Sequence, residues 1–267
     1  MTTKYYDRHN RRLVYIRRRA TSDYWDDHWS SRDTEATVAG LQGKQRFFPA
    51  TTAKYLPRGS RVVDGGCGMA DKVYALQEGG FDAHGVDFAT ETIERARRQA
   101  PTLKLVAGDL RQLPYASASF DGYWSIGVIE HFYDGFGPIA AEIRRVLRDG
   151  GLLFLTFPAM TAVRRLKAAL RAYPEWKPRE GDERLESFYQ FALTPEQVGR
   201  VFETEFGFDL VEAGARGGFR GLKEEAPRLM SLLKPVARAR RPPLSWARSM
   251  IEKASSHSAL LVLRKRG

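Results

Sequence analysis

Blocks of apolar and polar positions alternate along the first part of the chain, and they predict strands and helices in turn. Short apolar runs predict three strands at 62–63, 81–86 and 103–107. Amphipathic stretches between them, 70–78 and 90–100, predict helices that end at Gly79-Gly80 and Pro101. Strands that alternate with helices in this way favour a parallel sheet with right-handed crossovers.

The same pattern continues toward the end of the chain. Apolar runs predict further strands at 152–157, 208–213 and 257–263, and Thr194-Pro195 begins a helix that ends near Gly207. We therefore expect an α/β, Rossmann-like sheet of seven mostly parallel strands, with helices on both faces, an N-terminal helical cap and a helical insertion between strands six and seven. At 267 residues the chain is long enough for one large domain with appendages.

A basic amphipathic helix is predicted over residues 160–173. Helical spacing places one apolar set on a single face and the cations elsewhere. The apolar set is Val163, Leu166, Leu170 and Tyr173, and the cations are Arg164, Arg165, Lys167 and Arg171.

Three acids follow the first three predicted strands: Asp64, Asp87 and Asp109. Ligands of such sheets bind outside the carboxyl ends of the strands, where all three acids would lie. Asp87 follows Asp64 by 23 residues, close to the offset of about 20 for a carboxylate that holds ribose hydroxyls. Solvated loop acids are the alternative, but the repeated placement favours a cofactor site.

The turn after the first strand, Gly65-Gly66-Cys67-Gly68, lets a ligand contact bare backbone at a helix N-terminus. An ordinary glycine-rich loop is the alternative. A dinucleotide site would need glycine or alanine where Asp71 stands, and this acid would also lie beside a pyrophosphate. A cationic or phosphate-free cofactor therefore fits better.

The motifs in order resemble those of class I S-adenosylmethionine-dependent methyltransferases, most of all the type 11 branch that acts on small molecules, quinones and lipids. They are Val-Val-Asp-Gly-Gly-Cys-Gly from Val62, Gly85-Val86-Asp87, Ala107-Gly108-Asp109-Leu110, the run from Phe120 to His131, and Leu147-Arg148-Asp149-Gly150-Gly151. The resemblance is strong over about 60–158 and weak in the flanks. Ala70 departs from it, because the family usually has glycine there; alanine is small, and we expect it to be tolerated.

The resemblance implies S-adenosyl-L-methionine as cofactor, S-adenosyl-L-homocysteine as product, and a set of cofactor-binding residues. Gly66 and Gly68 would let the backbone approach the methionine part, Asp87 would accept from both ribose hydroxyls, and Phe88 would lie against the adenine. Asp109 would accept from the adenine amino group while the Leu110 backbone donates to the ring, and Ser125 and Ile126 would lie beside the sulfonium. Asp64 and Cys67 complete the predicted cofactor turn, and no metal site is expected.

The aromatic and acidic stretch from Ser22 to Trp29 predicts a short helix capped by Ser22. The resemblance implies that it closes the cofactor cleft, with Trp25 on the face that Trp29 shares. The alternative is that both tryptophans pin this helix to the body. Arg46 is a candidate partner of the cofactor carboxylate.

The fourth strand ends at Ser125 and Ile126; His131 follows it and is the candidate general base for a hydroxyl acceptor. Tyr189 is the candidate residue to orient that acceptor. For His131 the alternative is a buried histidine that only bonds a loop. The sequence leaves the acceptor and the oligomeric state open.

Charge is distributed unevenly along the chain. Residues 1–20 hold seven Lys or Arg against Asp7, and 214–267 hold thirteen against three Glu, whereas 21–213 hold 23 against 28 acids. We expect a basic arm and helical cap over 1–50, a methyltransferase domain over 51–216 and 257–267, and a basic amphipathic insertion over 217–256. Cys67 is the single cysteine, which excludes an internal disulfide and suits the reducing cytoplasm.

The insertion repeats apolar residues at helical spacing and surrounds them with arginine, notably Arg238, Arg240 and Arg241. One prediction is a lid that packs its apolar face on the domain. The other is an anionic membrane surface contacted through 219–256. The expected partner is a small-molecule or lipid-linked acceptor; nucleic acid, and a non-catalytic role as a partner subunit, are less favoured alternatives.

Overall fold

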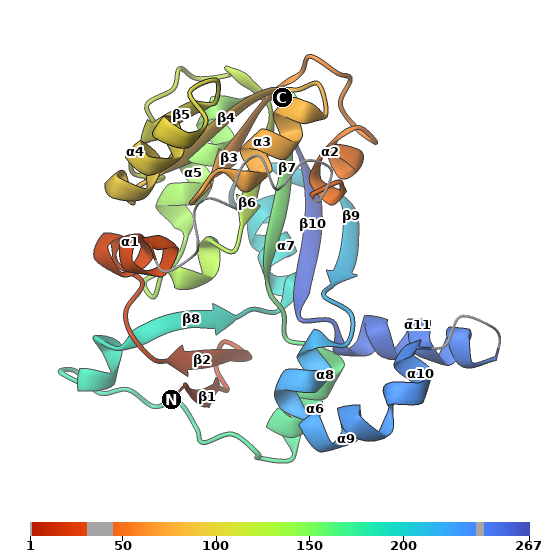
Figure 1. The fold of residues 1–267 in the computed structure, drawn as a ribbon. Coiled ribbons are helices and arrows are strands. Elements are labelled where there is room, and N and C mark those ends of the chain that lie inside the picture. Colours follow the sequence, from red (N-terminus) through yellow and green to blue (C-terminus); the bar gives the residue numbers. More distant parts are fainter. Residues whose placement is uncertain (1, 31–44, 239–242) are drawn as a thin grey trace.

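A seven-stranded sheet forms the centre of the computed structural model, which describes residues 2–30, 45–238 and 243–267 (Figure 1). Its strand order is β5-β4-β3-β6-β7-β10-β9. All neighbours pair in parallel except β10, which runs antiparallel to both β7 and β9. The strands are β3 (Arg61–Gly65), β4 (Asp82–Asp87), β5 (Lys104–Ala107), β6 (Phe120–Ile126), β7 (Leu147–Pro158), β9 (Phe208–Arg216) and β10 (Ser258–Lys265). The predicted sheet is confirmed.

Helices cover both faces of this sheet. Two separate apolar clusters show this: Val73, Leu76 and Ile93 belong to one, and Ile143 and Phe202 belong to the other. The helices over the first face are α2 (Phe47–Thr52), α3 (Asp71–Glu78) and α4 (Thr90–Gln99), and those over the second are α5 (Gly137–Val146) and α7 (Pro195–Thr204). Within the described residues, no helix combines the length and the apolar run that a bilayer crossing requires.

The start of the chain is a β-hairpin, so the predicted basic arm over the first twenty residues is wrong. Strands β1 (Thr3–Asp7) and β2 (Arg12–Ile16) pair with β8 (Phe188–Ala192) in a second, antiparallel sheet. Leu13 and Tyr15 enter one apolar cluster, while Val14 between them enters the main core. The prediction of an arm rested on the charge of the arginines. The alternation of Leu13, Val14 and Tyr15 between two apolar clusters is typical of a strand.

The predicted cap helix is present as α1 (Ser22–Ser30), which packs against α4. Its capping residue is not Ser22, whose hydroxyl donates to the Phe88 carbonyl at 3.2 Å. Thr21 caps it, because its Oγ1 accepts from the Tyr24 amide at 3.2 Å. The hydroxyl of Ser22 instead ties α1 to the loop that follows β4.

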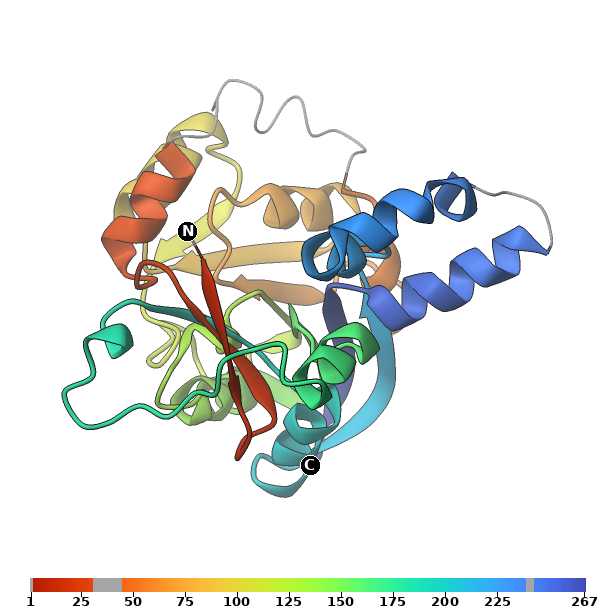
Figure 2. The same cartoon turned by 90° about the horizontal axis from the view of Figure 1, so that it is seen from below.

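The described residues of the insertion between β9 and β10 form four helices, which lie beside α6 (Ala162–Ala169) at the lower right of the molecule in Figure 1 and project to the right in Figure 2. The four are α8 (Arg220–Glu225), α9 (Pro227–Leu232), α10 (Lys234–Arg238) and α11 (Leu244–Ser255). Pro227 and Pro235 interrupt the predicted periodic stretch. The predicted Arg240 and Arg241 lie outside the described residues.

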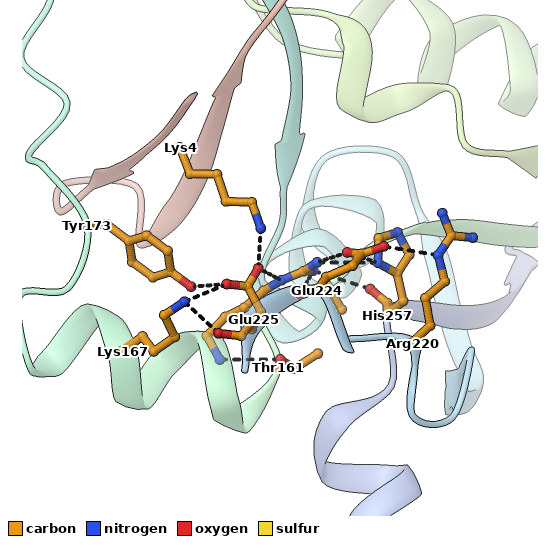
Figure 3. A network of polar contacts seen from close by, with 10 residues as sticks. Lys4, Thr161, Lys167, Tyr173, Arg220, Glu224, Glu225 and His257 are labelled. Atoms are coloured by element: carbon orange, nitrogen blue, oxygen red, sulfur yellow. Dashed lines mark hydrogen bonds and ion pairs between the residues drawn. The ribbon is translucent and has the colours of Figure 1, made fainter. Parts of the chain in front are cut away.

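Helix α6 and the residues after it depart from the prediction at Arg164 and at two leucines, whereas Tyr173 is buried as predicted. Arg164 is fully buried, whereas Leu166 and Leu170 are 61% and 70% exposed. Burial of a guanidinium requires paired carboxylates, and Glu224 and Glu225 of α8 supply them at 3.3 and 3.2 Å (Figure 3). Partners supplied by a distant segment therefore override the hydrophobic pattern of this helix.

Candidate active site

The turn between β3 and α3 has a left-handed backbone at three positions. The φ angles are +83° at Gly66, +51° at Gly68 and +61° at Ala70. Glycine adopts such angles at little cost, but alanine is strained there. The departure at Ala70 therefore falls on a position where the backbone favours the glycine usual in the family.

Asp87 is held at the end of β4 by two backbone amides. Its Oδ2 accepts from the Gly68 amide at 2.8 Å and its Oδ1 from the Ala89 amide at 2.9 Å. Burial raises the pKa of this carboxyl, and the two amide bonds oppose the rise. Each oxygen keeps a second lone pair, so the side chain can accept two further hydrogen bonds, as a ribose diol requires. Phe88, 39% exposed, follows directly.

Asp109 at the end of β5 is already paired with Arg111. The guanidinium donates to both carboxylate oxygens at 2.6–3.1 Å, and the Arg111 amide donates to Oδ1 at 2.8 Å. Hydrogen bonding from the Arg111 side chain lowers the pKa of Asp109. Asp109 is thus ionised and oriented by a neighbour that the sequence motif does not include.

Three buried polar side chains near the sheet edge have oxygen atoms without a hydrogen-bond partner in the described ranges: Asp64, Ser125 and Glu130. Burial raises the pKa of Asp64 to about 7 and that of Glu130 to about 8. Buried polar groups in proteins are normally paired, so these orphan oxygens fit a site built to hold a polar ligand.

His131 lies in a short 3₁₀ turn, Ile129–His131, and its ring contacts two aromatic side chains. Its Nδ1 is 2.6 Å from the Tyr189 carbonyl oxygen, and its ring meets the rings of Trp25 and Tyr189 edge-on at 5.3 and 5.1 Å. Because a carbonyl only accepts, Nδ1 carries the proton and Nε2 keeps a free lone pair. Burial lowers the pKa of His131 to about 4, so the ring is neutral at pH 7.

One cavity of about 1200 Å³ is lined by Asp87, Asp109, Glu130 and His131. Nine predicted site residues line it: Trp25, Gly66, Asp87, Phe88, Asp109, Leu110, Ile126, His131 and Tyr189. The other five are not among its lining residues: Arg46, Asp64, Cys67, Gly68 and Ser125. Arg46 is exposed beside α2, and Gly68 lies under Trp29, whose ring would be 2.7 Å from a Cβ at that position.

Two charged or titratable cavity residues lie far along the chain from the cofactor motifs. Arg220 of α8 and His257, just before β10, both line the cavity. Glu224 links them, since its carboxylate accepts from His257 Nδ1 at 2.9 Å and from Arg220 at 3.0 Å (Figure 3). No spacing in the sequence connects these positions to the motifs around Asp87, so only the fold reveals them.

The sheet order, the left-handed glycine turn and the doubly held Asp87 define a Rossmann-like domain with a nucleoside-cofactor site. Residues 63–155 match the family model of the type 11 methyltransferase domain. The matched stretch, about a third of the chain, is thus a methyltransferase domain of the class that the motifs indicated, and its cofactor is S-adenosylmethionine.

The chain is similar to several named methyltransferases. It is 32% identical over 118 residues to malonyl-[acyl-carrier protein] O-methyltransferase of Enterobacter lignolyticus, covering 44% of this chain and 47% of that protein. It is 33% identical over 141 residues to demethylmenaquinone methyltransferase of Beutenbergia cavernae, covering 51% and 50%. The chain thus spans about half the length of the curated relatives it matches.

A solved structure shows that the fold is shared over nearly the whole chain. It is 1,6-didemethyltoxoflavin-N1-methyltransferase of Burkholderia thailandensis, with bound 1,6-didemethyltoxoflavin and S-adenosylhomocysteine. The similarity has a TM-score of 0.55 and 18% identity, and it covers 99% of this chain and all of the other. At this identity the comparison establishes the fold alone.

Proposed function

We propose that this protein transfers a methyl group from S-adenosylmethionine to a hydroxyl oxygen of a small-molecule, lipid or lipid-linked acceptor. When bound, S-adenosylmethionine supplies an electrophilic methyl group and leaves as S-adenosylhomocysteine. Asp87 would hold the ribose hydroxyls, Phe88 the adenine face and Asp109 the adenine amino group. The doubly held carboxylate of Asp87 and the oxygen of Glu130 that is unpartnered among the described residues, both in the lining of the cavity, fit this cofactor.

The observation that carries the proposed reaction is the tautomer of His131. The Tyr189 carbonyl holds the proton on Nδ1, which leaves Nε2 as the basic atom in the cavity that Asp87 also lines. Nε2 would take the proton of the acceptor hydroxyl, so that the hydroxyl oxygen could attack the methyl group that the bound cofactor would supply. The low pKa of His131 keeps this atom unprotonated at neutral pH.

The class of acceptor is supported by the size and lining of the cavity. Its volume of about 1200 Å³ exceeds the usual range of about 300–1000 Å³ for a single ligand site, which gives room for a cofactor and an acceptor together. Trp25, Phe132 and Tyr133 supply apolar surface for the acceptor. Of the two curated relatives compared above, one is named for demethylmenaquinone, an apolar acceptor, whereas the other is named for a malonyl group on an acyl carrier protein.

Isotope transfer tests the proposal. Methyl-labelled S-adenosylmethionine is incubated with small-molecule and lipid extracts, and the labelled product is identified by mass spectrometry. His131→Ala should reduce turnover about a hundredfold or more while cofactor affinity stays near wild type. His9→Ala, at the exposed hairpin tip, is the matched control and should change neither.

Cofactor binding is measured separately by calorimetry. Asp87→Ala should weaken S-adenosylmethionine and S-adenosylhomocysteine alike by about 2–4 kcal/mol, because a charged acceptor of two hydrogen bonds is lost. Tighter binding of NAD than of either ligand would refute the methyltransferase proposal. Unchanged turnover in His131→Ala would remove this histidine from the reaction.

A further inference from the structure

Exposed apolar side chains are concentrated on the helices at one end of the molecule. Among the described residues nine large apolar side chains are exposed; five of them lie on α6, α9 and α11, and a sixth, Leu170, directly follows α6. On α9, Leu229 and Leu232 are 47% and 77% exposed, and on α11, Trp246 and Met250 are 69% and 74% exposed. Each pair has the i, i+3 or i, i+4 spacing that places both members on one face of a helix. The lid prediction, in which the apolar face packs on the domain, does not account for these pairs.

The three carboxylates between residues 220 and 255 are all engaged within the protein. Glu225, with a side chain 1% exposed, accepts from Lys4, Lys167 and Tyr173 and pairs with Arg164 (Figure 3). Glu224 and Glu252 are bound by arginine and histidine neighbours. Little negative charge is therefore left to face solvent from these helices.

The cations of the same helices have the opposite arrangement. Lys223, Arg228, Lys234 and Arg238 are exposed, and none forms an ion pair with a carboxylate in the described part of the chain. Exposed apolar pairs are thus accompanied by cations whose charge is not neutralised locally. This combination is the composition of a surface that lies in the headgroup region of a bilayer.

We propose that α9, α10 and α11 dock this protein on an anionic membrane surface. Arg228, Lys234 and Arg238 contact the lipid phosphates, and Leu232, Trp246 and Met250 enter the boundary between headgroups and acyl chains. A lipid surface fits better than nucleic acid, because exposed leucine and methionine side chains form no hydrogen bond or ionic contact with a phosphate backbone but are readily buried among acyl chains. The proposal does not depend on methyl transfer.

The docking helices directly follow a helix that lines the cavity. Helix α8, which precedes them, carries Arg220 into the cavity wall, and Glu224 of the same helix holds His257 there. A lipid-linked acceptor in the bilayer would accordingly approach the cavity beside the docking surface.

Vesicle sedimentation tests the charged part of the surface. Wild type should pellet with phosphatidylcholine vesicles that contain phosphatidylglycerol, and binding should fall between about 50 and 500 mM salt because the ionic part is screened. The triple variant Arg228→Gln, Lys234→Gln, Arg238→Gln should bind about a hundredfold less tightly, at about fivefold per cation. The control variant Lys54→Gln, Arg98→Gln, Arg200→Gln removes the same charge from exposed positions on α4, α7 and the segment after α2, and should bind like wild type.

A second pair of variants tests the apolar part. Trp246→Ser, Met250→Ser should weaken vesicle binding by about tenfold or more at high and low salt alike. Leu210→Ser, Val211→Ser removes two apolar side chains of β9 that are 41% and 42% exposed, and should bind like wild type. Thermal unfolding of each variant checks that it is folded.

Three outcomes would overturn the proposal. The first is an absence of pelleting with anionic vesicles at low salt. The second is equal loss in a docking variant and its control, because overall charge or hydrophobicity would then explain the binding. The third is displacement by short RNA at concentrations near its own Kd, which would assign the surface to nucleic acid. None of these results bears on labelled methyl transfer, so the two proposals fail separately.

Discussion

Replacement of Arg164 by methionine tests the main disagreement between sequence pattern and structure. The pattern predicts a solvated arginine, whose loss would be nearly neutral. The structure places its side chain at 0% exposure, with Glu224 and Glu225 at 3.3 and 3.2 Å and the Ala159 carbonyl at 2.7 Å. Loss of one partner from a buried ion pair costs about 3–5 kcal/mol.

The lower end of that range applies here. Glu225 keeps Lys4 at 2.6 Å and Lys167 at 3.0 Å, so its charge is not left alone when Arg164 is lost. We therefore expect Arg164→Met to reduce the free energy of unfolding by about 3 kcal/mol. For a chain of this size that corresponds to a melting temperature about 6–12 °C lower.

The matched control is Arg165→Met on the same helix. Arg165 is 46% exposed and pairs with Glu196 at 2.7 Å, an exposed pair worth at most about 1 kcal/mol. Urea unfolding followed by circular dichroism measures both variants. If Arg164→Met and Arg165→Met lose the same free energy within about 0.5 kcal/mol, the buried network does not stabilise the fold as argued.

The pH dependence of this difference is a second readout. Burial would raise the pKa of Glu224, but hydrogen bonds from His257 and Arg220 and the charge of Arg164 outweigh it and lower the pKa to about 2. A folded pKa below the unfolded value of about 4.3 contributes stability above that pH, and the contribution is lost as pH falls toward 2. The gap between wild type and Arg164→Met should therefore shrink from pH 4.5 downward.

Two further variants test buried positions of the site. Burial raises the pKa of Glu130 from about 4.5 in the unfolded chain to about 8 in the folded protein, so wild type should lose stability as the pH rises from 4.5 to 8. Glu130→Gln cannot ionise and should avoid this loss, which amounts to at most about 1.4 kcal/mol per pH unit. Parallel curves of unfolding free energy against pH for the two proteins would contradict that. Ala70→Gly should stabilise the protein by about 0.5–1 kcal/mol because it relieves a left-handed alanine, whereas Ala75→Gly inside α3 should destabilise it by about 1 kcal/mol. Equal destabilisation in urea unfolding would mean that Ala70 is not strained.

The sequence alone determines the sheet and its cofactor edge. Each strand from β3 to β6 is specified by a local apolar run, and Asp87 and Asp109 directly follow such runs. Parallel strands expose their carboxyl ends at one edge, so the position of a residue along the chain also gives its position in space. That is why the family, the fold and most of the cavity-lining cofactor residues follow from local patterns.

Only the tertiary structure decides which distant segments meet. The hairpin at the N-terminus gains its third strand from β8, which follows about 170 residues later, and His131 gains its orientation from Tyr189 on that same strand. Arg164 is buried because Glu225, 61 positions further along, is buried beside it. Hydrophobic periodicity alone predicts that an arginine on such a helix faces water. The arginine can instead be buried when the folded chain supplies carboxylates at hydrogen-bond distance.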